Sequence, residues 1–301
     1  MNKPASLART TFVWVQRLFT PAALVFLAYF VWLARDDLSS LLREASLPLL
    51  VIAVVIWSLF NIVTPFIAVI MFRACGVQVD WAHAFSIHAT RLPARYVPGG
   101  VWHTVGRVMD YSQQGVQPRH LTAFVLLENG LAATVALAVG GAAVFATREA
   151  DSIGTIALLA SLVGAAGLPA LWFVINNRVL KSSERLSLSA FALAASLMGA
   201  TWIIATISFL VYLGAFPASF VNHGYVEVGG IYLFSWGVGF LSVFAPQGIG
   251  VFELVSSKLI QSPIGFVGFA ALIGGFRIVV LVADLLVWIS SYLLRQRSDR
   301  K

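Results

Sequence analysis

The stretch Arg91-Leu-Pro-Ala-Arg-Tyr-Val-Pro-Gly-Gly-Val-Trp-His-Thr-Val-Gly-Arg107 interrupts a chain that otherwise consists of long apolar runs. It holds three arginines, one histidine, two prolines and three glycines within seventeen residues. Proline lacks the N–H that a helix interior needs, and glycine raises the entropic cost of ordering, so the helix is expected to break here. The sequence therefore predicts an irregular, positively charged segment next to lipid.

The composition is typical of a membrane protein. Of the 301 residues, 59% are hydrophobic and 11% are charged, whereas soluble domains carry about 25% charged residues. Several apolar runs exceed the ~18 residues that a helix needs to cross the hydrocarbon core. A barrel would instead show alternating segments of about ten residues. We therefore expect an all-α integral membrane protein that forms one polytopic domain over residues 1–301.

Charge and cysteine content argue against several function classes. The net charge of +7 is expected to reflect Lys and Arg on cytoplasmic loops, not a nucleic-acid partner. The single cysteine, Cys75, excludes an internal disulfide and a cysteine metal cluster. The sequence contains no Walker A loop, dinucleotide fingerprint, zinc-protease motif or nucleophile elbow, and its five histidines lack ligand spacing. We expect no metal and no cofactor, place His83 and His88 at the membrane interface, and favour a transporter over an enzyme.

Eight apolar segments are predicted to cross the membrane: 14–34, 47–72, 119–147, 154–176, 187–213, 228–245, the short 249–262, and 264–294. The first one resembles a signal peptide but lacks a small-residue cleavage site, so it is expected to remain as a span. Basic and acidic loops alternate along the chain, which predicts a multi-pass protein of the cell inner membrane with both termini in the cytoplasm. This topology requires the short segment to cross or to be completed by its neighbours.

A second break resembles the first one. The segments Tyr96-Val-Pro-Gly-Gly-Val-Trp102 and Phe244-Ala-Pro-Gln-Gly-Ile-Gly250 share an aromatic residue, a Pro-x-Gly unit and a β-branched residue, and lie 148 residues apart. Paired Gly/Pro interruptions in two halves of a chain are a sequence indicator of a transporter's binding site. Two interpretations stay open at this point: an internal repeat with halves 1–150 and 151–301, or chance similarity between two common patterns.

Four ionisable residues fall inside predicted spans: Glu128, Glu253, Arg277 and Asp284. Glu128 is about nine residues into its span, or ~13 Å deep. A charge at the bilayer centre costs at least ~2.5–3.5 kcal/mol, so such groups normally face the protein interior and have partners. We expect the arginine to pair with one of three acids. The remaining carboxylates would then accept a cationic headgroup or carry a proton, unless the charges form only structural ion pairs.

The cations of the first break are expected to lie together. His88, Arg91 and Arg95 have the spacing of one helical face, and His103 and Arg107 form an i, i+4 pair on the next helical stretch. One interpretation is a cytoplasmic surface loop whose arginines meet anionic headgroups. The other is a cationic pocket that dips into the membrane and binds phosphate through charge-assisted hydrogen bonds.

The two motifs together resemble a known family. Arg95-Tyr-Val-Pro-Gly-Gly-Val-Trp102 with Gly106-Arg107, and Pro246-Gln-Gly-Ile-Gly-Val-Phe-Glu253, are similar to the membrane region of the lysylphosphatidylglycerol synthase family. Glu128 fits the family's acidic position, whereas Asn129 stands where arginine is usual and Gln247 replaces a glycine. The family's soluble aminoacyl-transferase domain has no room in this chain, so the resemblance implies a stand-alone, flippase-like membrane module.

These observations define the candidate substrate-binding residues: Arg91, Arg95, Tyr96, Pro98, Gly99, Gly100, His103, Arg107, Glu128, Pro246, Gly248, Gly250, Glu253, Arg277 and Asp284. The predicted function is binding and translocation of an anionic, aminoacylated or polyprenyl-linked lipid across the inner membrane. The alternatives are a membrane-embedded transferase that acts on a lipid-phosphate sugar carrier, or a scaffold for an envelope-biosynthesis enzyme. The expected partner is a membrane lipid, and the sequence leaves open whether a second copy or an envelope enzyme also binds.

Overall fold

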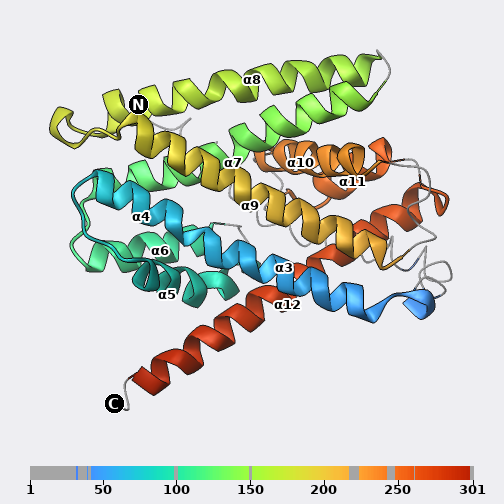
Figure 1. The fold of residues 1–301 in the computed structure, drawn as a ribbon, viewed down its shortest axis with the longest axis horizontal. Coiled ribbons are helices and arrows are strands. Elements are labelled where there is room, and N and C mark those ends of the chain that lie inside the picture. The colour runs from blue at the N-terminus through green and yellow to red at the C-terminus, as the bar shows by residue number, and fades with distance from the viewer. Residues whose placement is uncertain are drawn as a thin grey trace, which may run out of the picture.

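The computed structural model describes residues 32, 39, 42–97, 101–148, 151–216, 224–242, 248–260 and 262–298, and side chains of the last helix to residue 294. Every element within these residues is a helix, which confirms the all-α class (Figure 1). The elements are α3 (Leu47–Val63), α4 (Pro65–Ala74), α5 (Trp81–Arg91), η1 (Leu92–Tyr96), α6 (Trp102–Gln113), α7 (Pro118–Thr147), α8 (Ser152–Val174), η2 (Ile175–Val179), η3 (Ser182–Glu184), α9 (Leu188–Gly214), α10 (Tyr225–Leu241), α11 (Val251–Leu259) and α12 (Gly265–Ser298).

Five helical stretches in the described residues are long and apolar enough to cross a membrane: Leu47–Ala74, Pro118–Thr147, Ser152–Val179, Leu188–Gly214 and Gly265–Leu294. Each coincides with a predicted span. α10 is a shorter apolar helix. α11 has nine residues and rises only ~13.5 Å, so the predicted segment 249–262 does not cross a ~30 Å core on its own. The predicted span 14–34 lies outside the described residues, and the eight-span topology stays a prediction.

Close helix contact builds the outer layer of the fold. α7 and α8 lie side by side (Figure 1), and glycines remove the side chains that would separate them. A Cβ atom at Gly141 of α7 would collide with the backbone oxygen of Ala157, and one at Gly164 of α8 would lie 2.7 Å from the backbone oxygen of Thr134. The rest of α8 carries many exposed apolar side chains, which fits a surface that faces lipid.

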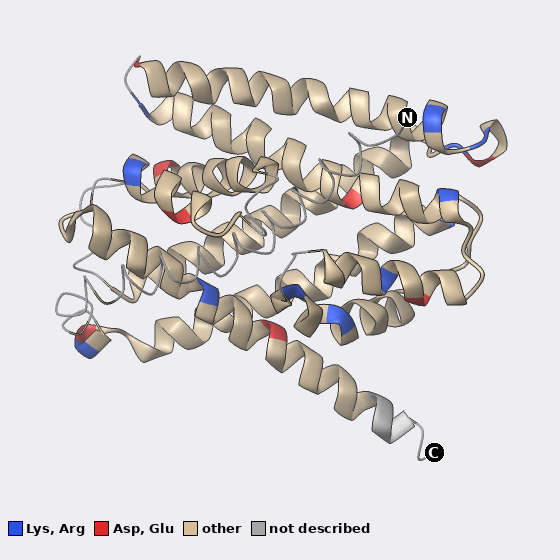
Figure 2. Cartoon of the chain, turned by 180° about the vertical axis from the view of Figure 1, so that it is seen from behind, with Lys and Arg blue, Asp and Glu red and all other residues tan. Residues whose placement is uncertain are grey.

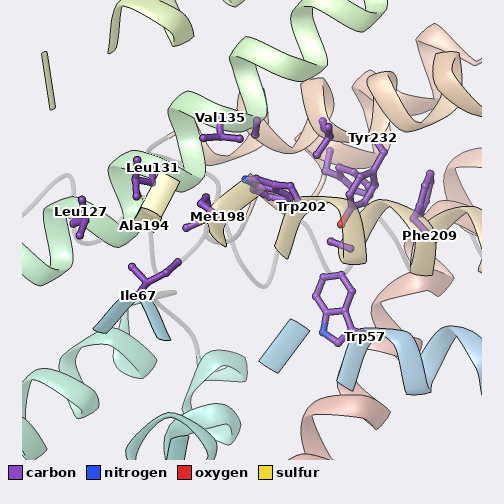
Figure 3. Close-up of a cluster of buried hydrophobic side chains, with 14 of the residues drawn as sticks. Trp57, Ile67, Leu127, Leu131, Val135, Ala194, Met198, Trp202, Phe209 and Tyr232 are labelled. Carbon is purple, nitrogen blue, oxygen red and sulfur yellow. The ribbon is translucent and has the colours of Figure 1, made fainter. Parts of the chain in front are cut away.

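Aromatic side chains fill the interior between α3, α7, α9 and α10 (Figure 3). The rings of Trp202 and Trp236 lie 4.3 Å apart at their centroids, and those of Phe209 and Tyr232 lie 4.7 Å apart. Trp57 of α3 belongs to the same buried cluster. Such rings bury large apolar areas, so this cluster holds α9 and α10 in place beside α7.

The short helices α5, η1 and α6 pack against one another and lie between two long helices. On one side Tyr111 of α6 is buried and contacts the rings of Phe72 on α4 and Phe124 on α7, at centroid distances of 4.6 and 5.8 Å. On the other side α12 contacts α5 and η1, and it also packs against α3 and α11. The helix α12 therefore touches the elements next to both predicted breaks.

Candidate functional site

Asp284 of α12 joins three elements. Its side chain is 1% exposed, and one oxygen accepts hydrogen bonds from Arg95 Nη1 and Tyr96 Oη of η1, both at 2.9 Å. The other oxygen accepts from Asn61 Nδ2 of α3 at 2.7 Å. Burial and the nearby carboxylate raise the pKa of the Tyr96 hydroxyl, which therefore stays protonated and donates. The carboxylate thus ties the first break to α3 and α12.

Two histidines continue this network away from Asp284. His88 Nε2 lies 3.3 Å from Asn61 Oδ1, and the rings of His88 and His103 meet edge to face at 5.1 Å. His88 is 2% exposed, so its side chain lies inside the protein, and its predicted depth at the membrane interface stays a prediction. Burial, with Arg107 and Arg95 close by, holds the pKa of both imidazoles well below the usual value, and both are therefore neutral.

Arg107 and Glu128 form the second buried pair. Arg107 Nη1 and Nη2 donate to the two oxygens of Glu128 at 2.9 and 2.5 Å, the bidentate geometry that strengthens such contacts. The side chains are 4% and 12% exposed. The guanidinium also lies 5.2 Å from the centre of the Phe124 ring. This pair connects α6, which follows the first break, to the long helix α7.

Glu253 and Arg277 form the third pair, beside the second break. Arg277 Nε donates to Glu253 Oε1 at 2.6 Å, and the backbone N–H of Gly250 donates to Oε2 at 2.7 Å. Gly248 and Gly250 have φ values of +65° and +84°, a region that favours glycine, and they turn the chain into α11. Glu253 is 2% exposed, whereas the Arg277 side chain is 30% exposed. Of the cations in the three pairs, Arg277 is the most accessible.

Arg91 does not join the other cations of the first break. Its guanidinium donates to both oxygens of Asp110 on α6, at 2.7 and 2.5 Å, and its side chain is 42% exposed. The helix α5 ends at Arg91, and Arg95 lies on the 3₁₀ turn that follows. The predicted common face of His88, Arg91 and Arg95 is therefore not formed: the two arginines bind different carboxylates.

The charge arrangement differs from the sequence prediction in a second way. The prediction placed three acids around one buried arginine. Instead, each acid has its own arginine: Asp284 binds Arg95, Glu128 binds Arg107 and Glu253 binds Arg277. The prediction of surplus carboxylates is thus wrong, because the arginines expected to bind phosphate lie against these acids.

Four of the predicted site residues cannot be compared with the structure, and two residues of the observed site were not predicted. Pro98, Gly99, Gly100 and Pro246 lie outside the described residues. Asn61 and Asp110 were missed by the sequence reasoning. The signal for Asn61 was an amide side chain inside the apolar run 47–72. Within the described part of the chain, no group of three or more His, Cys, Asp and Glu side chains has an arrangement that suits a metal ion.

No protein-family model matches this sequence, and no curated protein proves similar to it. The resemblance to the lysylphosphatidylglycerol synthase family consequently depends on the two motifs alone.

Proposed function

We propose that this protein translocates a lipid with a charged headgroup across the cell inner membrane, with both termini in the cytoplasm. The substrate class is an anionic, aminoacylated or polyprenyl-linked lipid. The observation that carries the proposal is the convergence of both interrupted segments on α12. Asp284 of this helix binds the η1 residues before the first break, and Arg277 binds Glu253 after the second one.

Energetics support a functional role for these charges. Replacing a buried ion pair with apolar side chains is often neutral or stabilising, so stability alone does not explain three such pairs in a membrane-embedded helical protein. Ionisable residues within membrane helices mark substrate or ion pathways, and irregular backbone at membrane depth lines cavities or lies within protein. The pairs Arg95–Asp284 and Glu253–Arg277 combine both features, because they adjoin the 3₁₀ turn η1 and the glycine turn before α11.

Arg277 is the proposed contact for the lipid phosphate. Its side chain is 30% exposed while its partner Glu253 is 2% exposed, so an anionic group reaches the arginine before the acid. A phosphate that binds the guanidinium competes with the carboxylate for the same charge-assisted donors. Release of Glu253 would loosen the turn at Gly250, whose N–H binds the same carboxylate. Headgroup binding would in this way act on the second break.

Reconstitution in proteoliposomes tests this proposal. Fluorescent phosphatidylglycerol, lysyl-phosphatidylglycerol and polyprenyl phosphate serve as probes, with phosphatidylcholine for comparison, and a membrane-impermeant reductant reports the leaflet of each probe. We expect headgroup-selective movement that falls at least about tenfold in Arg277→Gln and Glu253→Gln, the size of one lost charge-assisted contact. Glu184→Gln is the matched control, because it breaks an arginine–carboxylate pair that shares no residue with the three pairs of the candidate site.

Two results would contradict the proposal. One is a folded wild-type protein that moves none of the probes. The other is equal movement in wild type and in both site variants. The first result would favour a transferase acting on a lipid-phosphate carrier or a scaffold for an envelope enzyme. The second would show that Arg277 and Glu253 are not the lipid site.

A further inference from the structure

A groove opens between α4 and the start of α9, away from the three ion pairs. Its volume is about 730 Å³, within the range of about 300–1,000 Å³ that is usual for ligand sites. The lining residues are mostly apolar and none of them belongs to the candidate site described above. They are Phe66, Val69, Ile70, Arg73, Ala74, Trp81, Arg185, Ser187, Ala190, Leu193 and Leu197.

The polar and apolar parts of this groove are segregated. Arg73 lies in the last turn of α4, and Arg185 precedes α9 by three residues, so both cations stand at the same end of the two helices. From there the apolar wall extends to Phe66, seven residues and ~10.5 Å back along α4. Figure 2 shows basic residues at the edge of the molecule where α4 ends and α9 begins. The groove thus has a cationic mouth and an apolar interior.

Trp81 lines the groove at the opposite end from its mouth. Its ring stacks on that of Phe66 with centroids 5.7 Å apart, and its indole N–H donates to the backbone oxygen of Ile62 at 3.0 Å. The ring therefore lies beside Phe66 at the apolar end of the groove, ~10.5 Å along α4 from Arg73.

The two arginines at the mouth differ from those of the candidate site, because neither pairs with a carboxylate among the described residues. Arg73 Nε donates to the backbone oxygen of Val79 at 3.1 Å, and Arg185 is exposed. Ser187 caps α9 by accepting from the N–H of Ala190 at 3.2 Å, so the positive end of the helix dipole faces the same mouth. Because the C-terminal end of the α4 dipole lies at the same mouth, the net positive potential comes chiefly from the two guanidinium groups, and an anion would balance it.

We propose that this groove binds an anionic phospholipid, with the phosphate between Arg73 and Arg185 and an acyl chain along the apolar wall. The occupant is a membrane phospholipid because the anion site continues directly into an apolar groove between two helices that are long and apolar enough to cross a membrane. The proposal does not depend on lipid translocation. A lipid bound here contacts α4, α5 and α9, and so stabilises the contact between the short-helix region and the long helices.

The test measures lipid binding by native mass spectrometry of the delipidated protein. Phosphatidylglycerol is titrated against phosphatidylcholine with the same acyl chains. We expect preferential binding of phosphatidylglycerol, which falls about 10- to 30-fold in Arg73→Gln/Arg185→Gln. The matched control is Arg178→Gln/Lys181→Gln, which removes two exposed charges from the segment before α9 without touching the groove. We expect its affinity to stay within about twofold of wild type.

A steric variant separates the groove from general attraction to the basic edge. Ala190→Trp fills the apolar wall and keeps both arginines, so it should weaken phosphatidylglycerol and phosphatidylcholine binding alike. Equal affinity for both lipids in wild type would overturn the proposal. So would equal losses in the groove variant and the matched charge control, which would indicate that only the net charge of this edge attracts lipid.

Discussion

Asp284→Leu should strongly destabilise the protein. The substitution removes the acceptor of three hydrogen bonds, from Arg95, Tyr96 and Asn61. Breaking a buried ion pair from one side costs about 3–5 kcal/mol, because the remaining charge is buried without a partner. Arg95 is 19% exposed, so water relieves only part of this cost. We therefore expect a loss of about 3–5 kcal/mol in the free energy of unfolding.

The assay is reversible unfolding in mixed detergent micelles, followed by tryptophan fluorescence. Two further variants test whether the lost stability comes from the buried charge that has lost its partner. Asp284→Leu/Arg95→Leu removes both charges, and it should recover much of the stability lost in the single variant. Asp110→Leu breaks the pair with Arg91, whose side chain is 42% exposed, and should cost at most about 1 kcal/mol. A double variant no more stable than Asp284→Leu would refute the reasoning, as would a single-variant cost near that of Asp110→Leu.

Three further predictions concern other parts of the fold. Gly248→Ala should destabilise the folded protein by about 1–3 kcal/mol, because φ of Gly248 is +65° and the new Cβ would lie 3.0 Å from the α10 backbone. The control Gly199→Ala adds a Cβ that meets nothing within 4 Å, so it should be neutral or stabilising in the same unfolding assay. Burial, with a smaller effect of Glu184, raises the pKa of the Cys75 thiol to about 11, so maleimide should label the folded protein far more slowly than the unfolded one at pH 7. Hydrogen bonds from Arg119 and the adjacent histidine lower the pKa of the Glu184 carboxyl to about 2. These bonds therefore stabilise the folded protein fully above about pH 4.5, and this stabilisation is lost as the pH falls through about 2. The difference in melting temperature between wild type and Glu184→Gln should therefore stay constant from pH 7 to about 4.5 and then shrink, and a difference that grows on acidification would contradict this.

Run length made the long helices predictable. The segment predicted at 187–213 forms the helix Leu188–Gly214, because 27 consecutive mostly apolar residues have few alternatives to a helix in lipid. α11 shows the limit of this reasoning. Its sequence is apolar enough to predict a membrane crossing. The helix nevertheless has only nine residues, because it begins after Gly250 and ends before residue 260.

Ion-pair partners were harder to predict because tertiary packing selects them. Arg95 and Asp284 are 189 positions apart in the sequence, and nothing local to either residue indicates the contact. The sequence predicted that Arg95 binds a phosphate and that Arg277 pairs with Glu253, Asp284 or Glu128, and the structure shows the pair with Glu253. Each buried charge must lie against an opposite charge once the helices pack, and helix packing decides which opposite charge is nearest. Asn61 became part of the network for the same reason: it is the polar group on α3 that faces Asp284.

The two buried pairs that follow the breaks are related by reversal of charge. In each case a short helix begins after the break and a long helix follows it: α6 with α7, and α11 with α12. The first short helix supplies Arg107 to Glu128, whereas the second supplies Glu253 to Arg277. The separations of 146 residues from Arg107 to Glu253, and of 149 from Glu128 to Arg277, are close to the 148 residues between the motifs. This order and spacing agree with the internal repeat that the two motifs predict, and the repeat stays a prediction.

The reversal has a mechanistic consequence. In the first pair the cation is on the short helix and is 4% exposed, so it serves chiefly to hold α6 against α7. In the second pair the cation is on α12 and is 30% exposed, while the acid is buried on the short helix. Asp284 lies seven residues, or ~10.5 Å, further along the same face of α12 and holds the first break. An anion that displaces Glu253 from Arg277 would thus act on α12, which also binds the first break through Asp284, and the proposed translocation would depend on this coupling.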